Sequence, residues 1–143
     1  APEKNLRLFL AAVGAMRAAE PATRAVLVGD GPEGASLRAA HRDMVFAGMR
    51  RGADLARHYA SADVFVFPST TETFGNVTTE ALASGLAVVA FDYAAARQYI
   101  RHGESGLLAP FGDTSRFVEL TQDVAADGAL RSRLKAGALH AAR

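Results

Sequence analysis

The hydrophobic residues of this chain fall into short strand-like runs separated by segments with helical spacing. Apolar, β-branched runs lie at 25–28, 44–47, 64–67, 87–91 and 106–109. Helical patterns lie at 5–16, 34–41, 54–60, from 76 onward, at 94–101 and from 115 to the end. Strands that alternate with helices of this length predict a parallel sheet covered on both faces. The sequence therefore predicts an α/β domain with a doubly wound, Rossmann-like sheet.

The segment from residue 64 to residue 85 has clear boundaries between its elements. The run Val64 to Phe67 is followed by Pro68, which cannot extend a central ladder and so ends the strand. A helical stripe begins at Asn76. Gly85 stands where a helix C-terminus favours a left-handed residue. The segment is therefore predicted to be a strand, a loop and a helix.

Two carboxylates belong to this segment. Glu72 is predicted on the loop beyond the strand, and Glu80 about a turn inside the helix. Ligands of open parallel sheets bind at that carboxyl edge. The helix start exposes unpaired N–H groups that carry roughly half a positive charge, and Gly75 lets an anion approach them. A phosphate suits the helix start, and the two carboxylates suit hydroxyl groups.

The run from Asp63 to Gly85 resembles the E-x7-E donor signature of retaining GT-B glycosyltransferases of family 4, the glycosyl transferases group 1. The matching features are Pro68-Ser69, Glu72, Phe74-Gly75, Glu80-Ala81, Gly85 and the apolar strand at 87–91. This resemblance implies a nucleotide-sugar donor, either a UDP-sugar or a GDP-sugar. It also implies that Glu72 binds hydroxyls of the donor sugar and that Glu80 binds ribose hydroxyls.

The resemblance implies a diphosphate site as well. Its backbone donors would come from Phe74, Gly75, Asn76 and Val77. In the family, a lysine in the context Glu-Lys-Asn, which is Lys4 here, holds the donor diphosphate together with an upstream arginine. Lys4 is also open to a simpler interpretation as a solvated charge at a helix start.

Two further segments are candidate donor contacts. Gly29 and Gly31 belong to Gly-Asp-Gly-Pro, which lines the donor cleft of the family but also serves a tight turn. The wider run matches the G-x-G-x-x-G dinucleotide pattern, so an NADP-binding oxidoreductase module is a rival hypothesis. After the strand at 44–47, the resemblance implies that the backbone near Met49 and Arg50 contacts the nucleobase, although Arg50 could equally be a solvated charge. An epimerase-like nucleotide-sugar-binding domain is a second rival.

Composition narrows the function classes. The 143 residues carry a formal net charge of +1 without a dense basic block, which gives no indication of nucleic acid binding. Cysteine is absent, and the four histidines lack ligand spacing, so we expect no metal and no cofactor. No apolar stretch approaches the ~20 residues of a transmembrane helix. We expect a cytoplasmic location, compatible with peripheral contact of the intact enzyme with the inner membrane.

We interpret residues 1–143 as one nucleotide-sugar-binding domain, the C-terminal half of a GT-B fold. The family's domain begins with a strand, which this chain would lack, so the strands at 25–28 and 64–67 would have unpaired edges. The acceptor, a lipid or saccharide, would be bound mainly by an absent N-terminal domain, and the isolated fragment is expected to be inactive. Tyr93 to Ala96 departs from the glycines common in the family, so acceptor contacts or sugar preference are expected to differ here.

Overall fold

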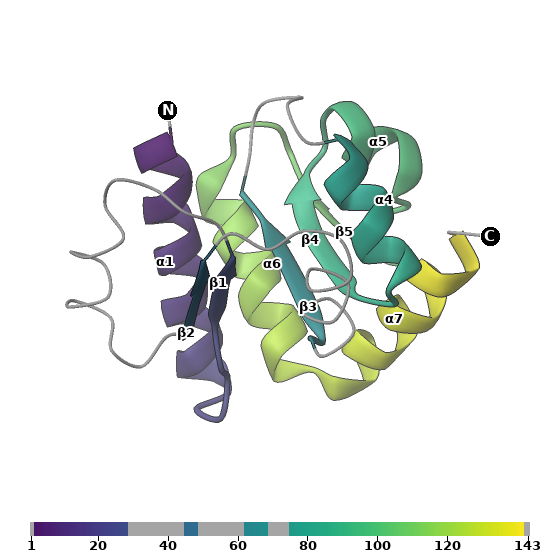
Figure 1. Cartoon of the computed structure of the whole chain (residues 1–143). Coiled ribbons are helices and arrows are strands. Elements are labelled where there is room, and N and C mark those ends of the chain that lie inside the picture. Colours follow the sequence, from purple (N-terminus) through teal and green to yellow (C-terminus); the bar gives the residue numbers. More distant parts are fainter. Residues whose placement is uncertain (1, 29–44, 49–61, 69–74, 142–143) are drawn as a thin grey trace.

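The computed structural model describes residues 2–28, 45–48, 62–68 and 75–141 (Figure 1). Its strands are β1 (Val26–Val28), β2 (Val45–Gly48), β3 (Val64–Phe67), β4 (Ala87–Phe91) and β5 (Gly106–Ala109). Its helices are α1 (Pro2–Ala19), α4 (Gly75–Ala83), α5 (Ala94–Tyr99), α6 (Thr114–Ala126) and α7 (Gly128–Ala141). The predicted alternation of strands and helices is confirmed for these segments. The helices predicted at 34–41 and 54–60 lie outside the described residues.

The strands form two parallel sheets. One contains β1 and β2, and the other has the order β3-β4-β5. In the larger sheet, Val66 pairs with Val89 and Val89 with Leu107, so the three strands run in register. Among the described strands, β1 pairs only with β2, and β3 has no partner other than β4. The expectation of unpaired edges at these two strands stays a prediction.

The central strand, β4, is buried on both faces. All five of its residues are buried. Ala87, Val89 and Phe91 join a cluster with residues of α1 and α6, whereas Val88 and Ala90 join a second cluster with residues of α4 and α5. This alternation follows from the two-residue period of a strand. It places α1 and α6 on one face of the sheet and α4 and α5 on the other.

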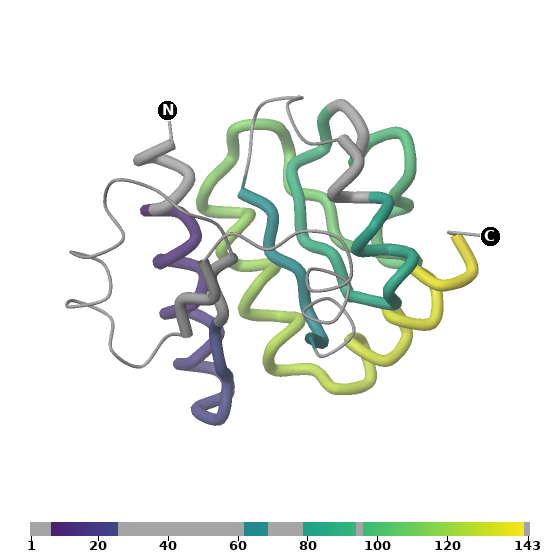
Figure 2. The backbone as a smooth tube through the Cα atoms, in the orientation of Figure 1, coloured from purple at the N-terminus to yellow at the C-terminus, as the bar shows by residue number. Residues whose placement is uncertain are grey.

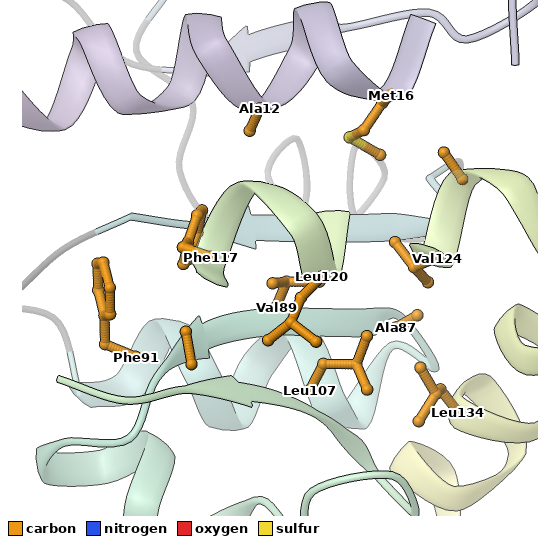
Figure 3. Close-up of a cluster of buried hydrophobic side chains, with 12 residues drawn as sticks. Ala12, Met16, Ala87, Val89, Phe91, Leu107, Phe117, Leu120, Val124 and Leu134 are labelled. Carbon is orange, nitrogen blue, oxygen red and sulfur yellow. The ribbon is translucent and has the colours of Figure 1, made fainter. Parts of the chain in front are cut away.

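The larger cluster is shown in Figure 3, where the side chains of α1 and α6 meet those of β4 and β5. The rings of Phe91 and Phe117 stack with their centroids 4.8 Å apart. Helix α7 contributes to both clusters, through Leu134 to the first and Ala138 to the second. The backbone path in Figure 2 shows α7 crossing beneath the end of the sheet opposite to the loop that joins β5 to α6.

The helix boundaries differ from the sequence pattern in two places. Helix α1 begins at Pro2 rather than at residue 5, because proline is tolerated in the first turn, where its missing N–H has no helical partner. The helical pattern after residue 115 is divided between α6 and α7 at Asp127. The Asp127 carboxylate accepts a hydrogen bond of 3.0 Å from the backbone N–H of Leu130, which begins a new helix there.

Two helical glycines give a test of the packing. A Cβ atom added to Gly14 would meet nothing within 4 Å, so Gly14→Ala should raise the free energy of unfolding by about 0.5–1 kcal/mol. A Cβ on Gly137 would overlap the backbone carbonyl of Glu104. Gly137→Ala should therefore lower the free energy of unfolding by roughly 1–3 kcal/mol, despite the better helix propensity of alanine.

Urea unfolding of the two purified variants, followed by circular dichroism, would measure both changes. The two substitutions are matched, because each replaces a glycine inside a helix. Equal, stabilising effects at both positions would contradict the close approach of α7 to the turn at Glu104.

Candidate functional site

The segments with predicted chemistry follow the carboxyl ends of the parallel strands. Strand β3 ends at Phe67, β4 at Phe91 and β5 at Ala109. Because the three strands are parallel, the connections that follow them leave the sheet at one edge. Figure 1 shows this edge at the top of the view, where α4 also begins. The candidate site is therefore assembled from neighbouring strand ends.

The start of α4 supplies backbone hydrogen-bond donors. Gly75 is the first residue of the helix, followed by Asn76 and Val77, one position earlier than the sequence pattern indicates. These residues form the first turn, whose N–H groups have no partner within the helix. The first turn contains no acidic residue that would offset the positive end of the helix dipole. It is therefore suited to an anion such as a phosphate.

Glu80 lies in the second turn of the same helix. Its neighbours Ala81 and Leu82 are 0% and 2% exposed and pack in the second core cluster, which fixes the rotation of α4. The Glu80 side chain itself is exposed. Within the part of the chain that the structure describes, its carboxylate has no hydrogen bond or ion pair. Its oxygens are therefore open to ligand hydroxyls.

The end of α4 is fixed by a backbone motif. Gly85 has a φ of 73°, as expected for a left-handed residue after a helix, which confirms the predicted helix end. Its N–H donates to the Leu82 carbonyl at 3.0 Å, and the N–H of Leu86 donates to the Ala81 carbonyl at 3.1 Å. This is the Schellman pattern. The helix is thus anchored at the end remote from its first turn.

The other predicted site residues are less fully described. Lys4 lies in the first turns of α1, where the backbone is described but the side chain is not. Six predicted positions lie outside the described residues: Glu72, Phe74, Gly29, Gly31, Met49 and Arg50. The structure places Gly75, Asn76, Val77 and Glu80 on α4, and the binding roles of all the site residues stay predictions.

An aromatic pair at the same edge was not predicted. The rings of Tyr93, just after β4, and Phe111, just after β5, lie with their centroids 4.6 Å apart at an interplanar angle of 39°. Phe111 is 53% exposed. The sequence singles out Tyr93 as a departure from the family pattern but gives no reason to pair it with Phe111. The sequence does carry a signal that Phe111 is exposed, because it stands between Pro110 and Gly112 in a turn immediately after a strand.

Residues 2–28, 45–48, 62–68 and 75–141 contain no group of three or more histidine, cysteine, aspartate or glutamate side chains placed to hold a metal ion. No helix in these ranges is long and apolar enough to cross a membrane.

Comparison with known families settles the class of protein. The sequence profile described as glycosyl transferases group 1 matches residues 1–127. The chain belongs to this family. The match covers both the start of α4 and Glu80, so the candidate site lies within the family's own domain. It favours a glycosyltransferase over an NADP-binding oxidoreductase.

A curated relative and two solved structures extend this assignment. A GDP-mannose-dependent alpha-mannosyltransferase of Mycobacterium tuberculosis is 48% identical over 115 residues, which are 79% of this chain and 29% of that protein. The C-terminal domain of a group 1 glycosyl transferase (LpcC) from Francisella tularensis superposes with a TM-score of 0.82 at 22% identity, covering 99% of this chain and 78% of that one. Anabaena HepE in complex with UDP-glucose superposes with a TM-score of 0.72 at 26% identity, covering 92% of this chain and 39% of that one.

These comparisons establish the fold as well as the family. The solved structures are glycosyltransferases of the GT-B type with Rossmann-like domains, and the predicted fold class is confirmed. Because the chain spans 29% of the mannosyltransferase's length, the activity of the whole protein is a separate question.

The anchoring of α4 can be tested at Gly85. A Cβ atom there would lie 3.2 Å from the Leu139 side chain, which is 47% exposed and can move aside, so the positive φ decides the effect. Gly85→Ala should lower the free energy of unfolding by about 1–2 kcal/mol. Gly85→Asn should cost less, because asparagine tolerates the left-handed region. Thermal unfolding measures both, and an equal loss in the two variants would point to packing against Leu139 instead.

Proposed function

We propose that this chain is the donor-binding domain of a retaining glycosyltransferase that transfers a hexose from a nucleoside diphosphate sugar. The observation that supports this most directly is the start of α4, where three N–H groups without a partner inside the helix lie about one turn before an exposed Glu80, whose carboxylate has no partner among the described residues. Such a helix start binds phosphate, and a carboxylate beside it binds hydroxyls. A nucleoside diphosphate sugar carries both groups.

The chemistry follows from the charge that develops during transfer. Breaking the anomeric C–O bond leaves negative charge on the β-phosphate of the leaving nucleotide, while the sugar becomes oxocarbenium-like. Preorganised N–H groups at Gly75, Asn76 and Val77 stabilise this charge, and the ammonium group of Lys4 adds to them. One such donor is typically worth about 3 kcal/mol of barrier. The reaction then needs no metal ion at the phosphates.

The two glutamates bind hydroxyls rather than transfer protons. In this proposal Glu72 holds hydroxyls of the donor sugar and Glu80 holds those of the ribose. A hydrolytic pair of carboxylates would have to flank the scissile bond with one of them protonated. Glu80 is exposed on α4 beside the proposed phosphate site, so it is better placed to bind ribose hydroxyls than to act as a hydrolytic acid or base.

GDP-mannose is the first donor to test. The mannosyltransferase relative that is 48% identical over its matched segment is named for that donor. UDP-glucose is the second, since it is bound by the structural relative that is 26% identical. We propose a lipid or saccharide acceptor held mainly by a separate domain. Residues 1–143 alone should therefore bind the donor weakly and transfer no sugar.

The roles of the glutamates are tested by single substitutions in the intact protein. Glu80→Ala should raise the Kd for the donor roughly ten- to a hundredfold, because a charged hydrogen bond is worth about 1.5–3 kcal/mol. Glu72→Ala should lower kcat more than it changes the donor Kd, because its contacts strengthen as the sugar distorts. Isothermal calorimetry with GDP-mannose and UDP-glucose, together with a radiolabelled transfer assay, measures both effects.

Glu119→Ala is a suitable control, because Glu119 is an exposed residue of α6 on the other face of the sheet. It should leave both the Kd and kcat unchanged. Negligible effects of both glutamate substitutions, or binding of NADPH in preference to either nucleotide sugar, would contradict the proposed function.

A further inference from the structure

The aromatic pair of Tyr93 and Phe111 lies at the carboxyl edge of β4 and β5, beside the proposed donor site. The strand ladder continues to this point, because the N–H of Asp92 donates to the Ala109 carbonyl at 2.7 Å. Tyr93 and Phe111 therefore follow directly from paired backbone. Their rings lie with centroids 4.6 Å apart, and more than half of the Phe111 side chain is exposed. An exposed aromatic side chain is thus present at the proposed ligand-binding edge.

The Phe111 side chain is presented by a defined turn. The N–H of Asp113 donates to the Pro110 carbonyl at 2.9 Å, which closes a four-residue turn with Phe111 at its second position. Gly112 has a φ of 80°, the value that a type II turn requires at its third position. A Cβ atom there would meet nothing within 4 Å, so the backbone conformation, and not space, requires glycine. Asp113 then caps α6 by accepting a hydrogen bond of 3.0 Å from the N–H of Arg116.

Tyr93 occupies a position where local stability favours another residue. It is the N-cap of α5, with extended backbone and no side-chain hydrogen bond to the helix start. Serine, threonine, aspartate or asparagine would satisfy one of the free N–H groups there. The tyrosine ring instead lies against Phe111. The capping hydrogen bond is thus given up for this ring contact, and positions that break a local preference are often functional.

Polar groups border the aromatic pair. The Arg97 guanidinium donates from Nε to Asp92 Oδ1 at 3.1 Å and from a terminal nitrogen to the Asp92 carbonyl at 3.0 Å. Both side chains are exposed, Arg97 by 66% and Asp92 by 43%. The surface beside the rings therefore offers both hydrogen-bond donors and acceptors to a ligand.

We propose that Tyr93 and Phe111 form a stacking platform for a six-membered polyol ring of the acceptor, a pyranose or a cyclitol. The apolar face of such a ring presents C–H groups with a partial positive charge, which the negative face of an aromatic ring attracts. Its hydroxyls reach Asp92 and Arg97. This inference rests on the proposed function, because it treats the ring as the partner of a donor bound at α4.

The position of the platform assigns it to the acceptor rather than to the donor. Strand β5 is two strand spacings, or roughly 10 Å, from β3, after which the donor sugar is expected. The nucleobase is expected after β2, which belongs to the other sheet. A ring on Phe111 is therefore displaced from both expected parts of the donor, which leaves the acceptor as its partner.

The test uses the intact protein and saturation-transfer NMR with methyl α-D-mannopyranoside and myo-inositol, with and without GDP. Wild type should transfer saturation to the C–H protons of one face of a probe ring. Phe111→Leu, which keeps an apolar side chain but removes the aromatic face, should weaken probe binding roughly three- to tenfold. Phe111→Trp should retain binding. Which probe binds distinguishes a pyranose from a cyclitol acceptor.

Tyr99→Phe and Tyr99→Ala are matched controls, because Tyr99 is a 46% exposed aromatic residue at the other end of α5. Neither should change probe binding. In transfer assays Phe111→Leu should raise the acceptor KM and leave the donor KM unchanged. A raised donor KM with an unchanged acceptor KM, or equal probe binding by Phe111→Leu and wild type, would overturn the platform. If wild type bound neither GDP-mannose nor UDP-glucose, the proposed function would be contradicted instead. Probe binding is measured separately from donor binding, so the two failures can be told apart.

Discussion

The burial of β4 on both faces is the constraint on which the rest of the domain depends. Its five residues are all buried and pair in parallel with β3 on one side and β5 on the other. A charged group inside this strand would be desolvated at a cost of several kcal/mol. Polar chemistry is therefore confined to the connections. Because the three strands are parallel, their outgoing connections share one edge, where Tyr93 and Phe111 from two of these connections meet.

Helix α4 packs in the core with its second half, and its first turn is the part proposed to bind a ligand. Its second half supplies Ala81 and Leu82 to the core and ends in the Schellman turn at Gly85. Its first turn carries no acidic side chain, and Glu80 is exposed. A carboxylate in the first turn would stabilise the free helix by about 0.3–1 kcal/mol but would compete with an incoming phosphate. The absence of that carboxylate is consistent with a helix start kept free for an anion.

The sequence is sufficient to predict the strands because each is a compact apolar run bounded by turn residues, as at Phe67 and Pro68. It also predicts Gly85, since a left-handed helix end needs a residue without a Cβ atom. It does not predict the pairing of Tyr93 with Phe111, because that contact depends on the register of β4 against β5 and not on local pattern. Glu72 was proposed on resemblance, and it lies outside the described residues.

Helix α5 lacks a capping hydrogen bond at its N-terminus because its stability comes from core packing rather than from its own end. This helix has six residues and an aromatic N-cap without a hydrogen bond, so it would not form in isolation. It is retained because Ala96 and Ile100 are buried in the second core cluster and because Arg97 ties it to Asp92. With packing supplying the stability, the N-cap position is released from its structural role. The residue at this position need not cap the helix, and the Tyr93 ring packs against Phe111 instead.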